Sequence, residues 1–336
     1  MTNNTERKTY IDRFLTQFFR GRPYQVEVVT GDASFRRYLR VHKESESYIL
    51  MDSDPSKVNN DPFVELNASF SQVGLRVPEI IATDMTHGLL LLNDLGCEHL
   101  ADLLQSPDRL KYYKSVLALI PSIAKVAYSP YMKPYDSAFI QQEIEIFEQW
   151  LLAGWLDYEL DDYQNAQWQL CKHQLVENML SQPQTTMHRD FHSRNIMRDE
   201  YHWVLIDYQD AVQGPVTYDV VSLLRDCYFR LPDDEFSLLH NESYHILTSA
   251  GLLNGMSYTD YQRYFDLTGL QRHLKAAGIF IRLLLRDNKG GYLNNIIPTL
   301  EYVIEVAERY ECFQWLATWL ANEIMPLIDN KLNTAK

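Results

Sequence analysis

Residues 187–211 read MHRDFHSRNIMRDEYHWVLIDYQDA, and this stretch determines how the rest of the chain is interpreted. Asn195 lies five residues after Asp190, and Asp207 follows the apolar run 203–206. This pattern suits phosphoryl transfer, in which one carboxylate accepts the proton of an attacking hydroxyl group. A second carboxylate and an amide oxygen are hard ligands of the kind that Mg²⁺ prefers. In the alternative interpretation, Asp190 and Asn195 are ordinary turn residues and Asp207 caps a buried strand.

The protein-kinase version of this motif supplies the expected roles of the three residues. By that template Asp190 is the catalytic base, and Asn195 and Asp207 hold Mg²⁺ between the phosphates of ATP. The template, not the spacing alone, assigns these roles.

The chain before this stretch differs from the chain around and after it. Short β-like runs separated by turn residues dominate the first 95 residues, with a helical pattern at the start and another in the middle. We predict strands at 24–30, 35–42, 48–52, 79–83 and 88–93, and helices at 10–19 and 62–73, the second one capped by Asp61. From residue 97 onward apolar residues recur every three to four positions, which predicts helices at 110–126, 138–153, 158–180, 218–231 and 261–285. The expected class is α+β, with a small antiparallel-sheet lobe at 1–96 and a larger helical lobe at 97–336.

The composition excludes several classes of protein. The chain has 336 residues, is 46% hydrophobic and carries a formal net charge of −14. Such an acidic protein repels a phosphate backbone, which argues against general nucleic-acid binding. The polar N-terminus lacks the apolar region of a signal peptide, and no apolar run approaches the roughly 18 residues of a membrane span. Four scattered cysteines predict reduced thiols rather than disulfides or zinc. We expect a cytoplasmic protein with small-molecule partners, no nucleic acid, no membrane and no implied protein partner.

Several segments resemble the aminoglycoside phosphotransferase-like kinases, which have a protein-kinase-like, two-lobed fold. The sharpest are HRDFHSRN, LIDYQD and GPVTYDVVSLLRD, between residues 188 and 226. GDASFRRYLRV (31–41), ILMDSDP (49–55), LLLNDLG (90–96) and the RHLK and FIRLLLRDNKGGYL segments of 272–293 resemble one branch in particular, the anomeric N-acetylmuramate/N-acetylglucosamine kinases of peptidoglycan recycling. The resemblance covers roughly residues 25 to 325. It implies a transferase that uses ATP and Mg²⁺ to make the α-1-phosphate of an amino sugar.

The resemblance also places the nucleotide in the first lobe. Its expected contacts are Ala33, Ser34, Phe35, Arg36 and Arg37 in the hairpin over the phosphates, with Asn93 and Leu95 near adenine. The strand lysine that usually pairs with the phosphates is missing, and Met51 stands near its place. We expect Arg36 or Arg37 to provide the positive charge instead.

The acceptor residues are expected in and after the central motif. His192 and Arg194 flank the proposed base, and Arg225 and Arg282 are further cations that a sugar carboxylate or phosphate would attract. For each of them a structural ion pair is an equal alternative. Asp219 is expected to anchor the loop or cap a helix rather than touch substrate.

Two other functions remain open from the sequence. The same chemistry is compatible with another acceptor, such as an aminoglycoside, choline or an amino alcohol. A nucleotide-binding pseudokinase is the alternative from a different class. The missing lysine favours the pseudokinase, whereas the presence of Asp190, Asn195 and Asp207 argues against it.

Overall fold

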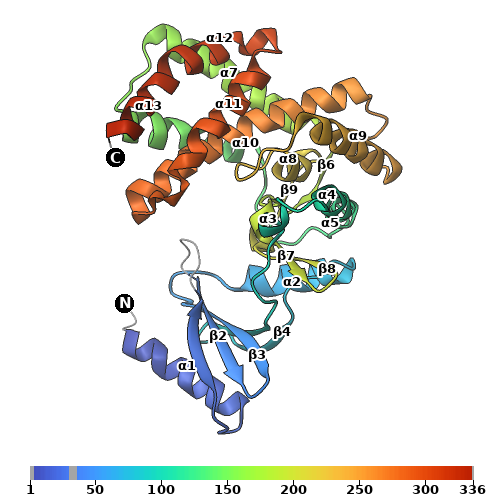
Figure 1. Ribbon diagram of the computed structural model, residues 1–336, viewed down its shortest axis with the longest axis vertical. Helices are drawn as coiled ribbons and strands as arrows, with labels where there is room; N and C mark the ends of the chain where they lie inside the picture. The colour runs from blue at the N-terminus through green and yellow to red at the C-terminus, as the bar shows by residue number, and fades with distance from the viewer. Residues whose placement is uncertain (1–3, 30–35, 335–336) are drawn as a thin grey trace. The chain divides into compact units, whose positions relative to one another are not determined.

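A computed structural model describes residues 4–29 and 36–334 of the chain (Figure 1). The chain divides into two compact units. The first takes in Met1–His99 and Ile196–Gln209, and the second takes in Leu100–Asn195 and Asp210–Lys336. The first unit contains a five-stranded sheet and the second is mostly helical, so the predicted α+β class is confirmed. The predicted domain boundary between residues 96 and 97 stays a prediction.

The sheet of the first unit is antiparallel, with strand order β1-β2-β3-β5-β4. Its strands are β1 (Gln25–Val29), β2 (Arg36–Lys43), β3 (Glu46–Ser53), β4 (Ile80–Asp84) and β5 (Leu89–Asn93). All five predicted strands are therefore present, although residues 30 and 35 of two predictions lie outside the described residues. Leu89–Leu92 are all buried, as expected for a short, continuous apolar run in a strand covered on both faces.

Two helices belong to this unit, α1 (Asn4–Phe18) and α2 (Asp61–Gln72). In α1, Ile11 and Leu15 are spaced by four residues and join the apolar cluster formed by Val41, Leu50, Leu89 and Leu91 of the sheet. The prediction that Asp61 caps α2 is wrong. Asp61 is the first helical residue, Asn60 holds the N-cap position without a side-chain cap, and the Asp61 N–H is satisfied by the Asn59 side chain at 3.0 Å.

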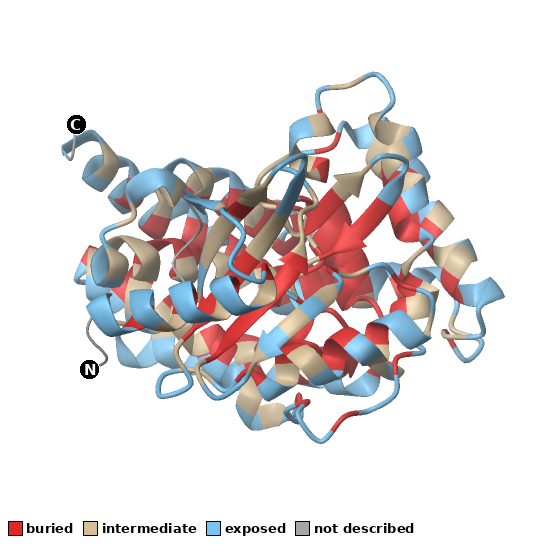
Figure 2. Ribbon diagram, turned by 90° about the horizontal axis from the view of Figure 1, so that it is seen from below, coloured by how far each residue is buried: buried red, intermediate tan, exposed pale blue. Residues whose placement is uncertain are grey.

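The helices of the second unit are α3 (Leu100–Leu103), α4 (Arg109–Leu117), α5 (Ile120–Ile123), α6 (Ser137–Ile146), α7 (Asp162–Ser181), α8 (Tyr218–Leu224), α9 (Asp233–Ser249), α10 (Tyr258–Asp287), α11 (Ile296–Ala307), α12 (Gln314–Trp319) and α13 (Met325–Thr334). The same unit holds the strand pair β6 (Gln184–Met187) and β9 (Val212–Pro215). The other short pair, β7 (Ile196–Asp199) and β8 (His202–Leu205), belongs to the first unit. Buried residues line the strands and the inner sides of the helices, and exposed residues line the outer sides (Figure 2).

Three predicted helices are interrupted or shorter than expected. The helix predicted at 110–126 is two helices, because Pro121 lacks the N–H that a continuous helix needs and instead lies in the first turn of α5. The helix predicted at 138–153 changes after Ile146 into the π-helical segment η1 (Phe147–Leu156). The helix predicted at 218–231 ends at Leu224, where the Asp226 carboxylate accepts the N–H of Tyr228 at 3.0 Å.

The long helix α10 packs closely against the junction of α6 and η1. A Cβ atom added at Gly278 would lie 2.5 Å from the carbonyl oxygen of Ile146, so only glycine allows this close approach. One turn earlier on α10, Lys275 contacts Glu143 of α6 at 2.6 Å. The crossing thus brings charged side chains of two distant segments together inside the helical core.

In the part of the chain that the structure describes, no helix is both long enough and apolar enough to cross a membrane.

Candidate active site

The central sequence motif lies on the loop formed by residues 188–195, called here the Asp190 loop. Strand β6 leads into this loop, and the short 3-10 turn η2 (Ser193–Asn195) ends it. Because β6 pairs with β9, the start of the loop is fixed by a strand ladder. Asp190 therefore lies just beyond a strand end, where a backbone turn presents its side chain.

Asp219 holds the beginning of this loop. Its two carboxylate oxygens accept the backbone N–H groups of His188 at 2.7 Å and Arg189 at 3.0 Å. Arg189 has φ of +76°, a conformation that non-glycine residues adopt only when their surroundings impose it. Burial raises the pKa of Asp219 to about 7, whereas the two N–H donors favour its charged form. Asp219 is thus the anchor of the loop, as the sequence predicted, and it fixes the residue directly before Asp190.

The second half of the loop is held from two directions. The Asp226 carboxylate accepts the N–H of Ser193 at 2.9 Å. The side-chain nitrogen of Asn195 donates to the carbonyl oxygen of Asp190 at 3.1 Å. Because the nitrogen makes this bond, the amide oxygen of Asn195 is the atom that remains suited to a cation.

Glu143 forms the centre of a buried charge network behind the loop. It is only 3% exposed and lies on the apolar side of α6. Its carboxylate accepts hydrogen bonds from Arg189 at 2.9 Å, Lys275 at 2.6 Å, Gln271 at 3.1 Å and Tyr135 at 3.0 Å. Burial alone would raise the pKa of Glu143, but the two cations dominate and lower it. The network fixes the Arg189 side chain and so supports the strained backbone beside Asp190.

The cations of this network also determine the charge of Asp190. Burial by itself raises the pKa of Asp190. The positive charges of Lys275 and Arg189 outweigh this effect and lower the pKa to about 2. Asp190 is therefore ionised at any pH at which the protein would work. An ionised carboxylate can orient a hydroxyl group and accept its proton as that group attacks.

We expect Glu143→Gln to destabilise the fold by about 3–5 kcal/mol, because removing one partner leaves buried Lys275 and Arg189 without their counter-charge. Since the folded-state pKa of Glu143 is lowered, its stabilising contribution is complete above its ordinary pKa of about 4.3 and is lost as the pH falls through the lower folded value. Urea denaturation at neutral pH and at acidic pH measures both effects.

The matched control for this variant is Glu145→Gln, two residues away on the same helix and only partly buried. The assigned role of Glu143 is wrong if both variants have the same free energy of unfolding at neutral pH.

Asp207 belongs to the first unit and follows β8. It has φ of +65°, so it is the third non-glycine residue of the motif in the left-handed region, after Arg189 and Glu200. The side-chain nitrogen of Gln209 donates to its Oδ1 at 2.6 Å. Burial raises the pKa of the neighbouring Tyr38 to about 12, with a further contribution from the charge of Asp207. The backbone turn presents an exposed carboxylate next to strand β2.

Amide and carboxylate oxygens, such as those of Asn195 and Asp207, are hard ligands of the kind that Mg²⁺ prefers. Over residues 4–29 and 36–334, no cluster of three or more His, Cys, Asp or Glu side chains is arranged for a metal. A kinase does not need one, because its Mg²⁺ takes one or two protein ligands and completes its coordination with phosphate oxygens and water.

The sequence left Arg36 and Arg37 as alternative sources of the positive charge near the phosphates. The strand register distinguishes between them. Arg37 pairs with Asp52 across the ladder, and its Nε donates to the Asp52 carboxylate at 2.9 Å. Arg7 of α1 donates to the same carboxylate at 3.0 Å. Since side chains alternate along a strand, Arg36 lies on the opposite face of the sheet from Arg37, the face of Tyr38 and Met51. The charges of Arg36 and Asp207 both act on Tyr38, which lies on this face.

The other expected nucleotide residues are only partly described. Ala33, Ser34 and Phe35 lie outside the described residues. Asn93 ends β5, and its side chain accepts the N–H of Glu79 at 2.8 Å, so it joins the ends of β4 and β5. Leu95 follows Asp94 and is partly exposed.

Two of the four expected acceptor residues, His192 and Arg194, belong to the Asp190 loop. His192 packs edge-on against Tyr228, with ring centroids 5.5 Å apart, and the guanidinium of Arg194 lies 3.7 Å from the centre of the same ring. Burial lowers the pKa of Arg282, and the positive charges of Arg286 and Arg189 lower it further. The charge of Arg189, the residue that precedes Asp190, thus acts on Arg282. The fourth, Arg225, lines a separate pocket that contains no residue of the loop.

Neither Glu143 nor Lys275 was expected from the sequence, and for Asp226 the sequence did not indicate a role in holding the loop. The sequence did contain a signal for Glu143. This residue shares a helical face with the apolar residues Ile140, Ile144 and Phe147, and a charge on a buried apolar face needs a partner. Lys275 similarly lies on the buried side of α10. Asp226 had no comparable signal, since its partner Ser193 is distant in sequence.

Comparison with known proteins agrees with this geometry. Residues 25–255 match the phosphotransferase enzyme family. The N-acetylmuramate/N-acetylglucosamine kinase of Pseudomonas aeruginosa is 35% identical over 290 residues, covering 86% of this chain and 86% of the relative. The kinase of the same name from Neisseria meningitidis serogroup B is 33% identical over 311 residues, covering 91% of this chain and 92% of the relative. Among solved structures, ADP-bound aminoglycoside phosphotransferase APH(2'')-Ib aligns with a TM-score of 0.58 at 11% identity, over 88% of this chain and 98% of that chain. The predicted protein-kinase-like fold is thereby confirmed.

Proposed function

The chain belongs to the phosphotransferase enzyme family, and we propose that it transfers the γ-phosphoryl group of ATP to the anomeric C1 hydroxyl of N-acetylmuramate, N-acetylglucosamine or both. The observation that carries the proposal is the Asp190 loop. Asp219 and Asp226 hold its backbone at three points, and nearby cations keep Asp190 ionised. A fixed, charged carboxylate on a strand-end loop is what in-line transfer to a hydroxyl group requires.

The roles follow from the chemistry of each side chain. Asp190 orients the attacking hydroxyl and accepts its proton. The amide oxygen of Asn195 and the carboxylate of Asp207 would hold Mg²⁺. When bound, the ion supplies positive charge that offsets the charge on the phosphate oxygens during transfer.

Arg36 replaces the strand lysine that this chain lacks. It lies on the sheet face of Met51, which stands near the usual lysine position, and its charge, like that of Asp207, acts on Tyr38. The Arg37 guanidinium is already paired with buried Asp52 on the other face. A guanidinium suits phosphate oxygens because it donates two parallel hydrogen bonds.

We expect Arg36→Ala to raise the KM for ATP by roughly 10-fold or more, which corresponds to the loss of one charge-assisted contact of about 1.5–3 kcal/mol. Arg37→Ala is the matched control, because it removes the same charge from the next residue and leaves Arg7 on Asp52. Steady-state kinetics with varied ATP distinguish the two variants. Equal KM values would mean that Arg36 does not bind the phosphates.

The acceptor contacts are proposed for His192, Arg194 and Arg282. The Nε of Arg282 is buried and has no hydrogen-bond partner among the described residues. It is therefore suited to the lactyl carboxylate of N-acetylmuramate. His192 and Arg194 are held by Tyr228 at the loop, where they can contact the sugar or the transferred phosphate.

The anomeric hydroxyl is the acceptor that best matches a carboxylate base. The ring oxygen withdraws electron density and stabilises the alkoxide, so this hydroxyl is more acidic than the other ring hydroxyls. The weak base Asp190 is correspondingly better matched to it. The names of the two relatives support an N-acetylated amino sugar as the acceptor.

The test is an ATP-turnover assay over a panel of acceptors with a blocked control. N-acetylmuramate and N-acetylglucosamine are expected to stimulate turnover, whereas an aminoglycoside, choline and ethanolamine are not. The α-methyl glycoside of the better sugar lacks the free C1 hydroxyl but keeps the other contacts, so it is expected to be inactive. If the glycoside reacts as fast as the free sugar, C1 is not the acceptor.

We place this reaction in the cytoplasm and in the recycling of peptidoglycan sugars. ATP is the proposed phosphate donor, and the four cysteines are free thiols, which suits a reducing compartment.

A further inference from the structure

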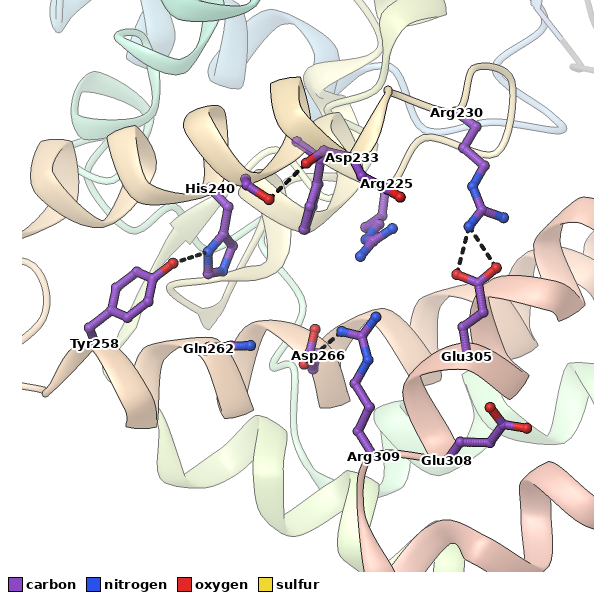
Figure 3. Close-up of a pocket in the computed structure, with 12 residues that line it drawn as sticks. Arg225, Arg230, Asp233, His240, Tyr258, Gln262, Asp266, Glu305, Glu308 and Arg309 are labelled. Atoms are coloured by element: carbon purple, nitrogen blue, oxygen red, sulfur yellow. Dashed lines mark hydrogen bonds and ion pairs between the residues drawn. The ribbon is translucent and has the colours of Figure 1, made fainter.

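A second pocket lies in the helical unit, away from the Asp190 loop. It has a volume of about 550 Å³ and is lined by residues of α9, α10 and the end of α8, with Glu308 and Arg309 beyond α11 (Figure 3). None of residues 188–195 lines it. The volume lies within the usual range of small-molecule sites and exceeds the size of a monosaccharide derivative.

Arg225 is the unusual charge in this pocket. It is the C-cap residue of α8 and is only 8% exposed. Its guanidinium stacks on Phe236 at 3.8 Å from the ring centre, and among the described residues no Asp or Glu forms an ion pair with it. Its Nε is buried and has no hydrogen-bond partner in the described part of the chain. Burial lowers the pKa of Arg225, and the nearby charges of Asp266 and Glu305 only partly offset this effect.

The other two arginines of the pocket are already paired. Arg230 donates to both carboxylate oxygens of Glu305 at 2.6 Å, and Arg309 lies 3.7 Å from the Asp266 carboxylate (Figure 3). Burial lowers the pKa of His240 to about 4, so this imidazole is neutral at neutral pH. Arg225 is therefore the cation of the pocket that is left for an anionic ligand.

The remaining lining residues suit hydroxyl groups and a ring. Asp233 and Glu308 carry carboxylates that can accept hydrogen bonds from hydroxyl groups, and Gln262 can donate or accept. Phe236 offers an aromatic face of the kind on which apolar sugar faces pack. Together these side chains favour a small ligand with one anionic group and several hydroxyl groups.

We propose that this pocket binds a monosaccharide derivative that carries one carboxylate or phosphate group, with the anionic group on Arg225. The pocket is a second ligand site, additional to the proposed acceptor site at Asp190. The same chemistry is found in a sugar acid such as N-acetylmuramate and in a sugar phosphate.

A ligand in the pocket would affect the Asp190 loop through the residues next to Arg225. The carbonyl oxygen of Arg225 lies 2.8 Å from His273 Nε2, and Asp226 accepts the N–H of Ser193. Asp226 also fixes Tyr228, against which Arg194 packs. A ligand that moves Arg225 therefore acts on the backbone that positions the loop.

The test is binding without ATP, read by hydrogen exchange of peptides that cover α9. The probes are N-acetylmuramate, N-acetylglucosamine 1-phosphate, inorganic phosphate and neutral N-acetylglucosamine. We expect protection of α9 by at least one charged sugar and none by the neutral sugar at the same concentration. Protection by only one charged sugar identifies the anionic group, and protection by inorganic phosphate supports recognition through the anion.

Two variants and a control make this test specific. Arg225→Met removes the cation, and Gln262→Glu adds a repelling charge at an exposed position of α10 where the fold does not depend on it. Each is expected to weaken the binding of the charged sugar by about 10-fold or more. Gln169→Glu makes the same change on the exposed side of α7 and should have no effect.

The proposal is overturned if neither charged sugar protects α9, if neutral N-acetylglucosamine protects it equally, or if Gln262→Glu binds like Gln169→Glu. If Arg225→Met does not fold, the binding measured for Gln262→Glu is sufficient to test the proposal. Because no turnover is measured, the outcome does not depend on whether the proposed kinase activity is correct.

Discussion

Asp190→Asn is expected to lower kcat by about 10²–10⁴ while leaving the affinity for ATP nearly unchanged. The amide has the size and shape of the carboxylate, but it can neither accept the proton of the sugar hydroxyl nor orient it through a negative charge. The Asp219 and Asp226 anchors bond to the backbone of the loop and not to the Asp190 side chain, so the loop should keep its conformation. Steady-state kinetics and ATP titration measure the two quantities separately.

The control for this variant is Asp162→Asn, an identical change at an exposed position of α7. It should retain normal kcat and ATP affinity. If Asp190→Asn loses its affinity for ATP together with kcat, Asp190 belongs to the nucleotide site or to the scaffold, and its assignment as the base is wrong.

Asp207→Asn is expected to lower kcat by roughly 10² or more, because the variant loses a charge that the Mg²⁺ ion needs. The fold should remain intact, since Asp207 is exposed and is supported by Gln209 at its own turn. The concentration of Mg²⁺ needed for half-maximal rate should rise. A Mg²⁺ titration of the rate at saturating ATP measures both effects.

Asp199→Asn provides the comparison, because it removes a charge at the end of β7 in the same unit. Its rate and Mg²⁺ requirement should match those of the unchanged protein. Near-normal turnover of Asp207→Asn at saturating Mg²⁺ would show that Asp207 is not a metal ligand.

The sequence predicts most secondary structure because the signals are local. Alternating and continuous apolar runs marked all five strands of the sheet, and the 3.6-residue period marked the main helices. The ends of helices were less predictable where distant contacts decide them. Helix α8 stops where Asp226 bonds to Tyr228 and to Ser193, 33 residues before it in the chain, a contact that no helical pattern reveals.

The same distinction applies to the site. The motif at 187–211 marked Asp190, Asn195 and Asp207 because their spacing is short. It could not choose between Arg36 and Arg37, since that choice depends on the pairing of Arg37 with Asp52 and on the contact of Asp52 with Arg7. The role of Glu143 depends on the packing of α10 against α6, which Gly278 makes possible. Only the folded chain brings these residues together.

Analysis of the reaction product tests the central claim most directly. The protein is incubated with ATP, Mg²⁺ and N-acetylmuramate or N-acetylglucosamine, and the phosphorylated sugar is examined by phosphorus-proton correlated NMR. The account predicts a phosphorus atom coupled to the anomeric proton of an α-configured sugar. A sugar phosphate coupled to the protons of any other carbon, or ATP consumption without any sugar phosphate, would contradict it.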